Sequence, residues 1–354
     1  MNVQVGITSS GKERQSNIEL LRIIAMAMIL ILHADALSLS IPTIEDFRVS
    51  PLGFSVRHLF ESLCIGSVDV FILISGYFGI RPSIKSFSKF ISQCLFFFVS
   101  IYIIAILTGI SNLTITGVRE VFFLTPINWF ITAYIGLYLL APILNVFIDN
   151  ADRKQHRNVI IAFYVFQTIY GCTGAAQFFV DGYGTLSFIG LYLLARYIKI
   201  YPPLLIEKPR AVYLLVYLIS CLALFALQFV PIIFGRSIPY ISDYNYINPI
   251  VLLMSVSLLI YFTKIDFQSK VVNWIAASSF AVFLLHSNPN IISGFFKQTC
   301  IHIYQNYNGI VCFLLFAVFL LSIYAVAFLC DQIRILIWHQ IEKKFVNITR
   351  GNRE

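Results

Sequence analysis

The chain has 354 residues, of which 58% are hydrophobic and 12% are charged, with 33 Phe and 19 Tyr. Soluble domains carry about 25% charged residues, so this composition excludes a soluble globular protein and indicates a chain embedded in a lipid bilayer. The seven cysteines are scattered without a CxxC pair, which is typical of small buried hydrophobic residues rather than of a metal site.

Ten apolar segments are long enough to cross a membrane. In chain order we predict them near residues 17–37, 57–79, 88–110, 127–148, 158–179, 185–201, 211–234, 247–263, 271–291 and 310–338. The first segment contains Arg22 and lacks a small-residue cleavage site, so we expect it to remain as a span rather than to be removed as a signal peptide. The connections are short. The sequence therefore predicts an all-α integral membrane domain over 17–338, between polar cytoplasmic tails at 1–16 and 339–354.

The distribution of Lys and Arg predicts that both ends of the chain are cytoplasmic. With the N-terminus inside, 20 of the 25 Lys and Arg fall on the cytoplasmic side. Five fall on the outer side: Arg48, Arg57, Arg119, Arg236 and Lys297. The net charge of +8 is explained by this N-in, C-in topology and requires no nucleic-acid partner.

Two ionisable side chains share one stripe of the first segment. Arg22 and His33 are eleven residues apart, so at about 100° per residue they point within about 20° of each other, roughly 16 Å apart along the axis. An arginine at the centre of a membrane costs on the order of 2.5–3.5 kcal/mol, so such residues typically line a polar cavity. Two structural alternatives remain: an i,i+3 pair of Glu19 with Arg22, and a histidine that only bonds a neighbouring helix.

Other polar side chains are predicted at middle or outer depth. They are Asp69 in the second segment, Trp129 and Tyr134 in the fourth, and Ser279 and His286 on one face of the ninth. We expect them to line one water-filled cavity with His33, bounded on the cytoplasmic side by Arg22. Asp69 could instead hold helices together, and Trp129 could be an interfacial aromatic residue.

The hexapeptide GLYLLA occurs twice, beginning at Gly136 in the fourth segment and at Gly190 in the sixth, 54 residues apart. Both copies run from outside to inside, so they do not form the inverted repeat found in many secondary transporters. A chance match in so apolar a chain remains an alternative.

The predicted cavity suits acyl transfer. A neutral imidazole can act near pH 7 as a general base or as a nucleophile that carries an acyl group, and an arginine can bind phosphate or a thioester carbonyl. No metal-ligand spacing, P-loop, GxGxxG or GxSxG motif occurs. The sequence therefore gives little support to a metalloenzyme, a nucleotide hydrolase or a serine hydrolase.

Four segments resemble acyltransferase family 3, the ten-helix membrane O-acyltransferases that modify bacterial surface glycans. Leu21-RIIAMAMILILH is similar to the family's helix-one signature of an arginine, ten residues and a histidine. The others are Val68-DVFILISGYFGIRP, Asn128-WFITAYIGLYLLAPILN and Ser279-FAVFLLHSNP, which occur in the family's order. The four segments are spread over most of the chain.

This resemblance implies that His33 is the catalytic histidine and that Arg22 faces the acyl donor. It implies a multi-pass enzyme of the bacterial inner membrane with no bound cofactor. The donor substrate would be cytosolic acetyl-CoA, and the acceptor a hydroxyl of a surface polysaccharide or its lipid-linked precursor. Arg81 and Lys89 would help to bind the donor, although Ser86-FSK retains only the second position of the RxxR-like pair of many members. No esterase-like domain is fused to the chain, so transfer would finish in the membrane part or with a partner.

Two other functions fit a chain of apolar helices. A transporter or glycan exporter without covalent chemistry would also need a central polar cavity, but the helix-one histidine and the four segments argue against it. A polysaccharide polymerase would carry a large outer loop rich in Arg and His, whereas the longest outer loops, about 38–56 and 292–309, are short.

Overall fold

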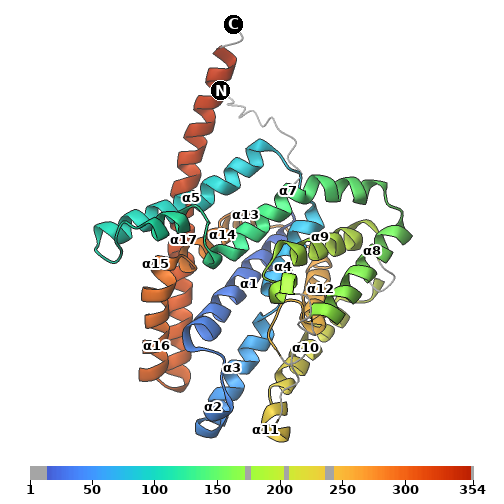
Figure 1. The fold of residues 1–354 in the computed structure, drawn as a ribbon, viewed down its shortest axis with the longest axis vertical. Coiled ribbons are helices and arrows are strands. Elements are labelled where there is room, and N and C mark those ends of the chain that lie inside the picture. The colour runs from blue at the N-terminus through green and yellow to red at the C-terminus, as the bar shows by residue number, and fades with distance from the viewer. Residues whose placement is uncertain (1–13, 172–176, 203–206, 236–242, 352–354) are drawn as a thin grey trace, which may run out of the picture.

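The computed structural model describes residues 14–171, 177–202, 207–235 and 243–351, and every regular element in these ranges is a helix (Figure 1). The first half of the chain forms α1 (Ser16–Leu32), η1 (His33–Leu37), α2 (Ile44–Val49), α3 (Pro51–Cys64), α4 (Ser67–Phe78), α5 (Ile84–Leu107), α6 (Ile115–Val121), η2 (Pro126–Asn128), α7 (Trp129–Asn150), α8 (Arg153–Phe166) and η3 (Gln167–Gly171). The second half forms η4 (Gln177–Gly182), α9 (Thr185–Ile200), α10 (Arg210–Leu227), α11 (Val230–Phe234), α12 (Pro249–Thr263), α13 (Lys270–Ala276), α14 (Ser279–His286), α15 (Pro289–Ile291), η6 (Ile292–Phe296), α16 (Lys297–Asn306) and α17 (Gly309–Gly351).

Six helical stretches among the described residues are long and apolar enough to cross a membrane: Ser16–Leu37, Pro51–Phe78, Ile84–Leu107, Ile115–Asn150, Arg210–Phe234 and Gly309–Gln340. The pair Lys270–His286 and Pro289–Asn306, bent by 59°, adds a seventh if it counts as one span. The protein is therefore compatible with multiple membrane passes. Every one of the ten predicted segments contains a helix, but α8, α9 and α12 have only 14, 16 and 15 residues. Ten spans and the N-in, C-in topology stay predictions.

Four stretches differ from what hydrophobicity predicts. The predicted segment 271–291 is not one straight helix, because Pro289 follows α14 and starts a new short helix capped by Asn288. The outer stretches 38–56 and 292–309, expected as loops, contain α2, the start of α3, η6 and α16. The stretch 339–354, expected as a tail, is helical to Gly351 within α17, which rises above the other helices in Figure 1. Most of the predicted tail 1–16 lies outside the described residues.

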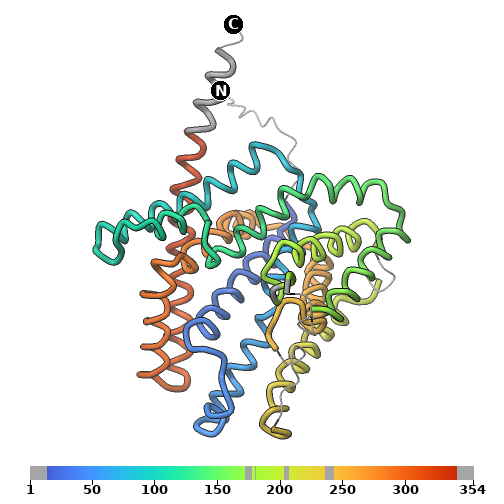
Figure 2. Tube along the Cα trace, in the orientation of Figure 1, coloured from blue at the N-terminus to red at the C-terminus, as the bar shows by residue number. Residues whose placement is uncertain are grey.

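Helix α1 lies in the middle of the bundle, against α3, α4, α12, α13 and α14 (Figure 2). Ile18, Leu21 and Ala25 are fully buried there. Its neighbour α4 packs closely on α9 because Gly76 has no side chain: a Cβ at this position would lie 2.9 Å from the Tyr192 carbonyl oxygen. Small residues at such contacts are typical of membrane helices.

Hydrogen bonds group the helix ends on two sides of the bundle. On one side, Ser16 at the start of α1 bonds Gln268 and Asn273 after α12, each at 2.9 Å. On the same side, Asn145 in the second half of α7 donates to the Ile80 carbonyl after α4. His33 at the end of α1 and His286 at the end of α14 meet on the other side. The two ends of α1 therefore contact different sets of helix ends.

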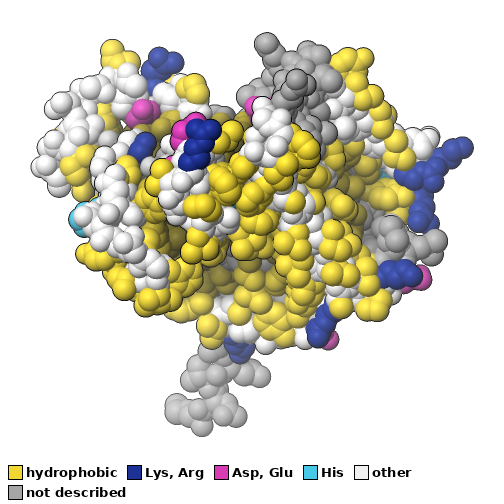
Figure 3. Space-filling model, turned by 90° about the horizontal axis from the view of Figure 1, so that it is seen from below, with side chains coloured by type: hydrophobic (Ala, Val, Ile, Leu, Met, Phe, Trp, Pro, Cys, Tyr) yellow, Lys and Arg dark blue, Asp and Glu magenta, His cyan; other side chains and the backbone are white. Residues whose placement is uncertain are grey.

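Figure 3 views the molecule from the end that carries α2 and the α16–α17 connection; hydrophobic side chains are spread over this face, with Lys, Arg, Asp and Glu in scattered groups. Large apolar side chains are also exposed along α5, α10 and α17, for example Leu107, Leu222 and Leu321. Exposed apolar surface on this scale requires an apolar environment such as lipid.

Candidate active site

Two histidines from distant parts of the chain are directly hydrogen-bonded. His286 Nε2 lies 2.9 Å from His33 Nδ1, and the two ring centroids are 4.9 Å apart. His286 is fully buried, and its Nδ1 lies 2.5 Å from the Val282 carbonyl oxygen one turn earlier in α14. The sequence placed both histidines at one depth, and the structure brings them into contact.

The hydrogen bonds determine which nitrogen carries each proton when both rings are neutral. A carbonyl oxygen can only accept, so Nδ1 of His286 is the donor and its Nε2 carries the lone pair. His33 then donates from Nδ1, which leaves its Nε2 unprotonated. No group in the described part of the chain bonds to that nitrogen. His33 thus presents a basic and nucleophilic atom.

The backbone that carries His33 leaves the α-helical path at this residue. His33–Leu37 form a π-helical turn, a deviation that is frequent at functional sites. Asp35 in this turn forms an ion pair with Arg57 of α3, with 2.5 Å between Oδ1 and Nε, and Arg57 also donates to the Ser40 carbonyl. Asp35 therefore fixes the turn through Arg57 rather than orienting the imidazole directly.

A cavity of about 420 Å³ opens at His33. Its described lining residues are His33, Leu37, Ile127, Trp129, Phe283, Ser287, Ile292, Ser293 and Lys297. The volume lies within the range usual for small-molecule sites, and the lining is largely apolar with a few polar groups, as such sites commonly are. Trp129, expected at the membrane interface or on the substrate, forms part of this wall.

Behind Trp129 lies a cluster of tyrosines with a buried acid. The ring of Trp129 lies 4.6 Å from that of Tyr183 and 6.1 Å from that of Tyr246, centroid to centroid. Asp69, in the first turn of α4, interacts electrostatically with Tyr246 and Tyr164. Its carboxylate is 1% exposed, and Oδ2 has no hydrogen-bond partner among the described residues. Asp69 is not part of the cavity lining.

Two more of the predicted residues, Arg22 and Tyr134, lie together near the start of α1. Arg22 pairs with Glu19 at 3.2 Å and keeps a side-chain exposure of 26%. Tyr134 interacts with Arg22 and hydrogen-bonds to Ser75 at the end of α4. The Glu19–Arg22 pair expected as a structural alternative therefore exists, and it leaves part of the guanidinium accessible.

The two copies of GLYLLA hold the α4–α5 connection. Tyr192 accepts a hydrogen bond from the Ile80 amide at 3.1 Å, and Tyr138 accepts one from the Ser83 amide at 2.9 Å. The equivalent tyrosines of the two copies thus hold the two ends of the segment that contains Arg81. Arg81 and Lys89 are both exposed. The repeat has a structural use that its sequence alone did not reveal.

The cavity at His33 includes only some of the residues predicted to line a single cavity. The 420 Å³ cavity reaches His33, but its described lining does not include Arg22, Tyr134 or Ser279. Between Arg22 and His33, the residues on the same stripe are Met26 and Ile29, which are 1% and 3% exposed and pack in the hydrophobic core. Two polar groups, one at each end of α1, are therefore separated by about two turns of apolar side chains.

Ser279 has a structural contact instead of a place in the cavity. It is fully buried, and its hydroxyl lies 3.0 Å from that of Tyr324 on α17. This bond fixes α14 against α17 and so supports the helix that carries His286.

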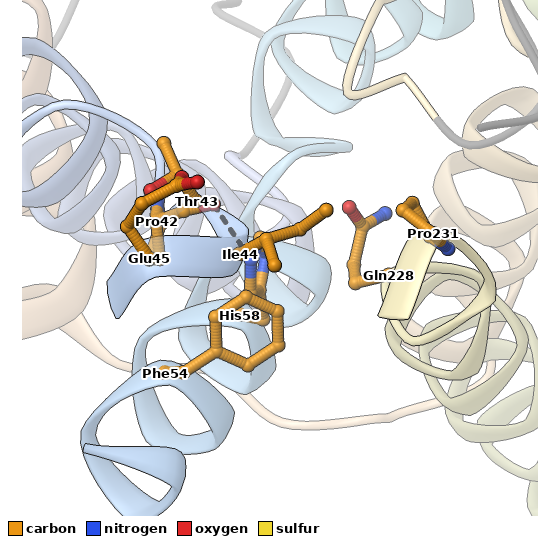
Figure 4. Close-up of a pocket in the computed structure, with 8 residues that line it drawn as sticks. All are labelled: Pro42, Thr43, Ile44, Glu45, Phe54, His58, Gln228 and Pro231. Carbon is orange, nitrogen blue, oxygen red and sulfur yellow. Dashed lines mark hydrogen bonds between the residues drawn. The ribbon is translucent and has the colours of Figure 1, made fainter. Parts of the chain in front are cut away.

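A smaller hollow of about 310 Å³ lies beside α2, α3 and α11 (Figure 4). It contains a third histidine, His58, whose Nε2 lies 3.3 Å from the Pro42 carbonyl oxygen and whose Nδ1 lies 3.2 Å from the Tyr244 hydroxyl. Both nitrogens are therefore engaged in contacts that hold the α2–α3 region, and His58 presents no free atom to a reactant.

Of the lining residues, the sequence predicts only His33 and Trp129; it does not indicate Leu37, Ile127, Phe283, Ser287, Ile292, Ser293 or Lys297. Lys297 is predicted only as one of five outer basic residues, because nothing in the hydrophobic pattern indicates that the stretch after Ser287 lines the cavity at His33. Its nearness to Ser293, four residues earlier, was the available signal, since that spacing places both on one face of a helix.

A family model described as an acyltransferase domain matches residues 15–327. The matched stretch includes both polar groups, from Arg22 to Lys297. Comparison with curated proteins and with solved structures found no match.

Proposed function

Because the chain belongs to acyltransferase family 3, we propose that this membrane acyltransferase is an O-acetyltransferase. It transfers an acetyl group from cytosolic acetyl-CoA to a hydroxyl of a cell-surface polysaccharide or of its lipid-linked precursor. The enzyme lies in the bacterial inner membrane with both termini in the cytoplasm. The observation that carries the proposal is the free Nε2 of His33 in a cavity, with His286 bonded to the other nitrogen.

The acceptor hydroxyl binds next to His33 on the outer side. Nε2 takes the hydroxyl proton as the oxygen attacks the thioester carbonyl, the C–S bond breaks, and the thiolate of CoA leaves and is protonated. His286 supports this step because it accepts the Nδ1–H bond, which strengthens as the ring becomes positively charged. Alternatively, Nε2 first takes the acetyl group and then passes it to the acceptor. Acetyl-CoA labelled in the acetyl group, supplied without acceptor, separates the two routes, because only the second leaves label on His33.

The donor binds at the other end of α1. Arg22, with Arg81 and Lys89 on the neighbouring connection and helix, supplies positive charge for the phosphates of CoA. Arg22 and His33 are roughly 16 Å apart along the helix, so the pantetheine arm has to span this distance. Transfer therefore requires the arm to pass beside α1 and to displace Met26 and Ile29.

His33→Ala tests the function directly. We expect it to lower acetyl transfer from acetyl-CoA to the glycan about 10²- to 10⁴-fold, the usual contribution of a general base. His302→Ala, which removes an exposed histidine of α16, is the matched control and should leave transfer unchanged. Membrane insertion of both variants is checked by protein recovery from the membrane fraction.

Analysis of the surface glycans of a deletion strain that lacks this protein provides a second test. Intact surface glycans that lack ester-linked acetyl support the proposal, whereas missing or truncated chains favour an exporter or a polymerase. A His33→Ala protein that inserts and still acetylates its glycan would contradict it.

A further inference from the structure

The cavity at His33 contains a single charged side chain among its described lining residues. Lys297 lies at the start of α16, is partly buried, and forms no ion pair with any residue that the structure describes. The other outer cation nearby, Arg57, is neutralised by Asp35. The site next to the catalytic nitrogen therefore has a net positive charge without a protein counter-ion.

The remaining lining residues are suited to a sugar. Trp129 provides an aromatic surface, and Ser287 and Ser293 provide hydroxyl groups. Ser293 bonds the Pro289 carbonyl at 3.2 Å, so its oxygen keeps a lone pair for another donor. Aromatic, hydroxyl and ammonium groups together match a ligand with an apolar ring face, hydroxyl groups and a negative charge.

Placing a lysine in a partly buried site has a cost unless an anion joins it. The outer surface around it has few basic residues, since only five of 25 Lys and Arg are predicted on that side. Lys297 is therefore not explained by the topology of the chain.

We infer that the acceptor is anionic, and that Lys297 binds a carboxylate or phosphate group on the glycan or on its lipid-linked carrier. This inference rests on the proposed function and makes Lys297 a determinant of acceptor specificity. The group bound by Lys297 lies away from the hydroxyl that reacts, so its binding is the same in the ground state and the transition state. Its loss therefore raises KM and leaves kcat unchanged.

The test combines enzyme variants with acceptors of different charge. The acceptor is the unacetylated surface glycan of a strain that lacks the chain, used as isolated, after chemical reduction of its carboxyl groups, and as the lipid-linked precursor. Purified protein in phosphatidylcholine nanodiscs is assayed as wild type, Lys297→Gln and Lys297→Arg. Arg48→Gln, which removes an exposed cation of α2, is the matched control.

We expect Lys297→Gln to raise KM for the charged acceptor roughly tenfold, Lys297→Arg to retain most of the affinity, and the control to match wild type. With the neutral acceptor, the KM of wild type should rise by the same factor, and Lys297→Gln should raise it no further. If reduction of the carboxyl groups abolishes the effect of Lys297→Gln on KM, the bound group is a sugar carboxylate. If the effect occurs only with the lipid-linked precursor, the bound group is its phosphate. Equal KM for wild type and Lys297→Gln on every acceptor overturns the inference. The inference is also overturned if the effect of Lys297→Gln on KM depends on anionic phospholipid added to the nanodisc and not on the charge of the acceptor.

A binding measurement distinguishes failure of this inference from failure of the proposed function. If no acetyl group is transferred to any glycan, the proposed function fails. Calorimetric binding of the same glycans to the His33→Ala protein then tests Lys297 alone. Binding of the charged glycan that Lys297→Gln weakens supports the anion site, and binding that is absent or independent of Lys297 overturns it.

Discussion

His286 determines what His33 can do, although it need not touch a substrate. Its ring is held by a carbonyl of its own helix and by full burial, so it has one orientation and one acceptor nitrogen. That nitrogen accepts the Nδ1–H of His33, and Nε2 of this cavity-lining ring keeps no hydrogen-bond partner among the described residues. In the proposed reaction, His286 is thus a positioning residue, comparable to the third member of a catalytic triad but uncharged.

Replacing His286 by Leu should lower kcat about 10²-fold, because His33 then loses the acceptor that fixes its tautomer. His286→Gln should recover part of this loss, since its amide oxygen can accept the Nδ1–H bond. A merely structural histidine would show no such rescue. The measurement is kcat for acetyl transfer at saturating donor and acceptor, normalised to folded protein. Equal activity of the Leu and Gln variants would contradict a positioning role.

Residue positions along a single helix could be predicted, whereas contacts between helices could not. The spacing of Arg22 and His33 fixes their shared stripe, and the end of the ninth segment fixes the depth of His286. The contact of His33 with His286 depends on how α1 packs on α14. Lys297 could not be predicted, because its place at the cavity depends on the 59° bend between α14 and the helices that begin at Pro289. Asp69 was expected in the cavity, but the break at Gly66 starts α4 in a position where Asp69 faces tyrosines.

At the scale of elements, hydrogen bonds from α7 and α9 fix the α4–α5 connection. Gly79 adopts a φ of 78°, which ends α4, and Ser83 caps α5 by accepting from the Ser86 amide. Tyr192 accepts from the Ile80 amide between these two residues, and Tyr138 accepts from the amide of Ser83 itself. Tyr192 also donates to Asn145 at 2.7 Å. Arg81 therefore projects from a segment whose backbone is fixed by α7 and α9.

Tyr138→Phe combined with Tyr192→Phe should raise KM for acetyl-CoA about fivefold to tenfold, with KM for the glycan unchanged. The double variant loses the hydrogen bonds of the two hydroxyl groups to Ile80, Ser83, Ser86 and Asn145. Each contributes roughly 0.5–1.5 kcal/mol, so their loss allows Arg81 to move. Each single variant should show a smaller shift. Tyr102→Phe, which removes a hydroxyl that bonds the Asn112 carbonyl and the Thr114 amide near the other end of α5, is the matched control. A change confined to the KM for glycan would contradict this role.

Hydrophobic runs predicted where helices occur, because each run is long and nearly free of charge. They did not predict where a run breaks, since breaks such as that between α3 and α4 contain Ile65 and Gly66 rather than polar residues. They also gave no sign that the GLYLLA copies act on one segment, because that follows from the packing of α4 against α9 through Gly76.

At the scale of the whole molecule, the two polar groups lie at opposite ends of α1, and apolar residues separate them. An acyltransferase that takes its donor from one side of a membrane and its acceptor from the other needs this separation, because an open channel would leak ions. Met26 and Ile29 supply it in the described structure. The distribution of Lys and Arg predicts that the Arg22 end lies in the cytoplasm and the His33 end outside.

Single cysteines introduced into a cysteine-free variant test this orientation. Asn150 and Asp266 are exposed at the Arg22 end, whereas Glu45 and Asn308 are exposed at the His33 end. We expect a membrane-impermeant maleimide to label Glu45→Cys and Asn308→Cys in intact cells, and Asn150→Cys and Asp266→Cys only after permeabilisation. Asp266 tests the three short helices α8, α9 and α12, which have 14, 16 and 15 residues. If all three cross the membrane, Asp266 and Glu45 lie on opposite sides; if none does, they lie on the same side. Labelling of Asp266→Cys from outside would contradict the ten-span topology, and with it the separation of donor and acceptor on which transfer across the membrane depends.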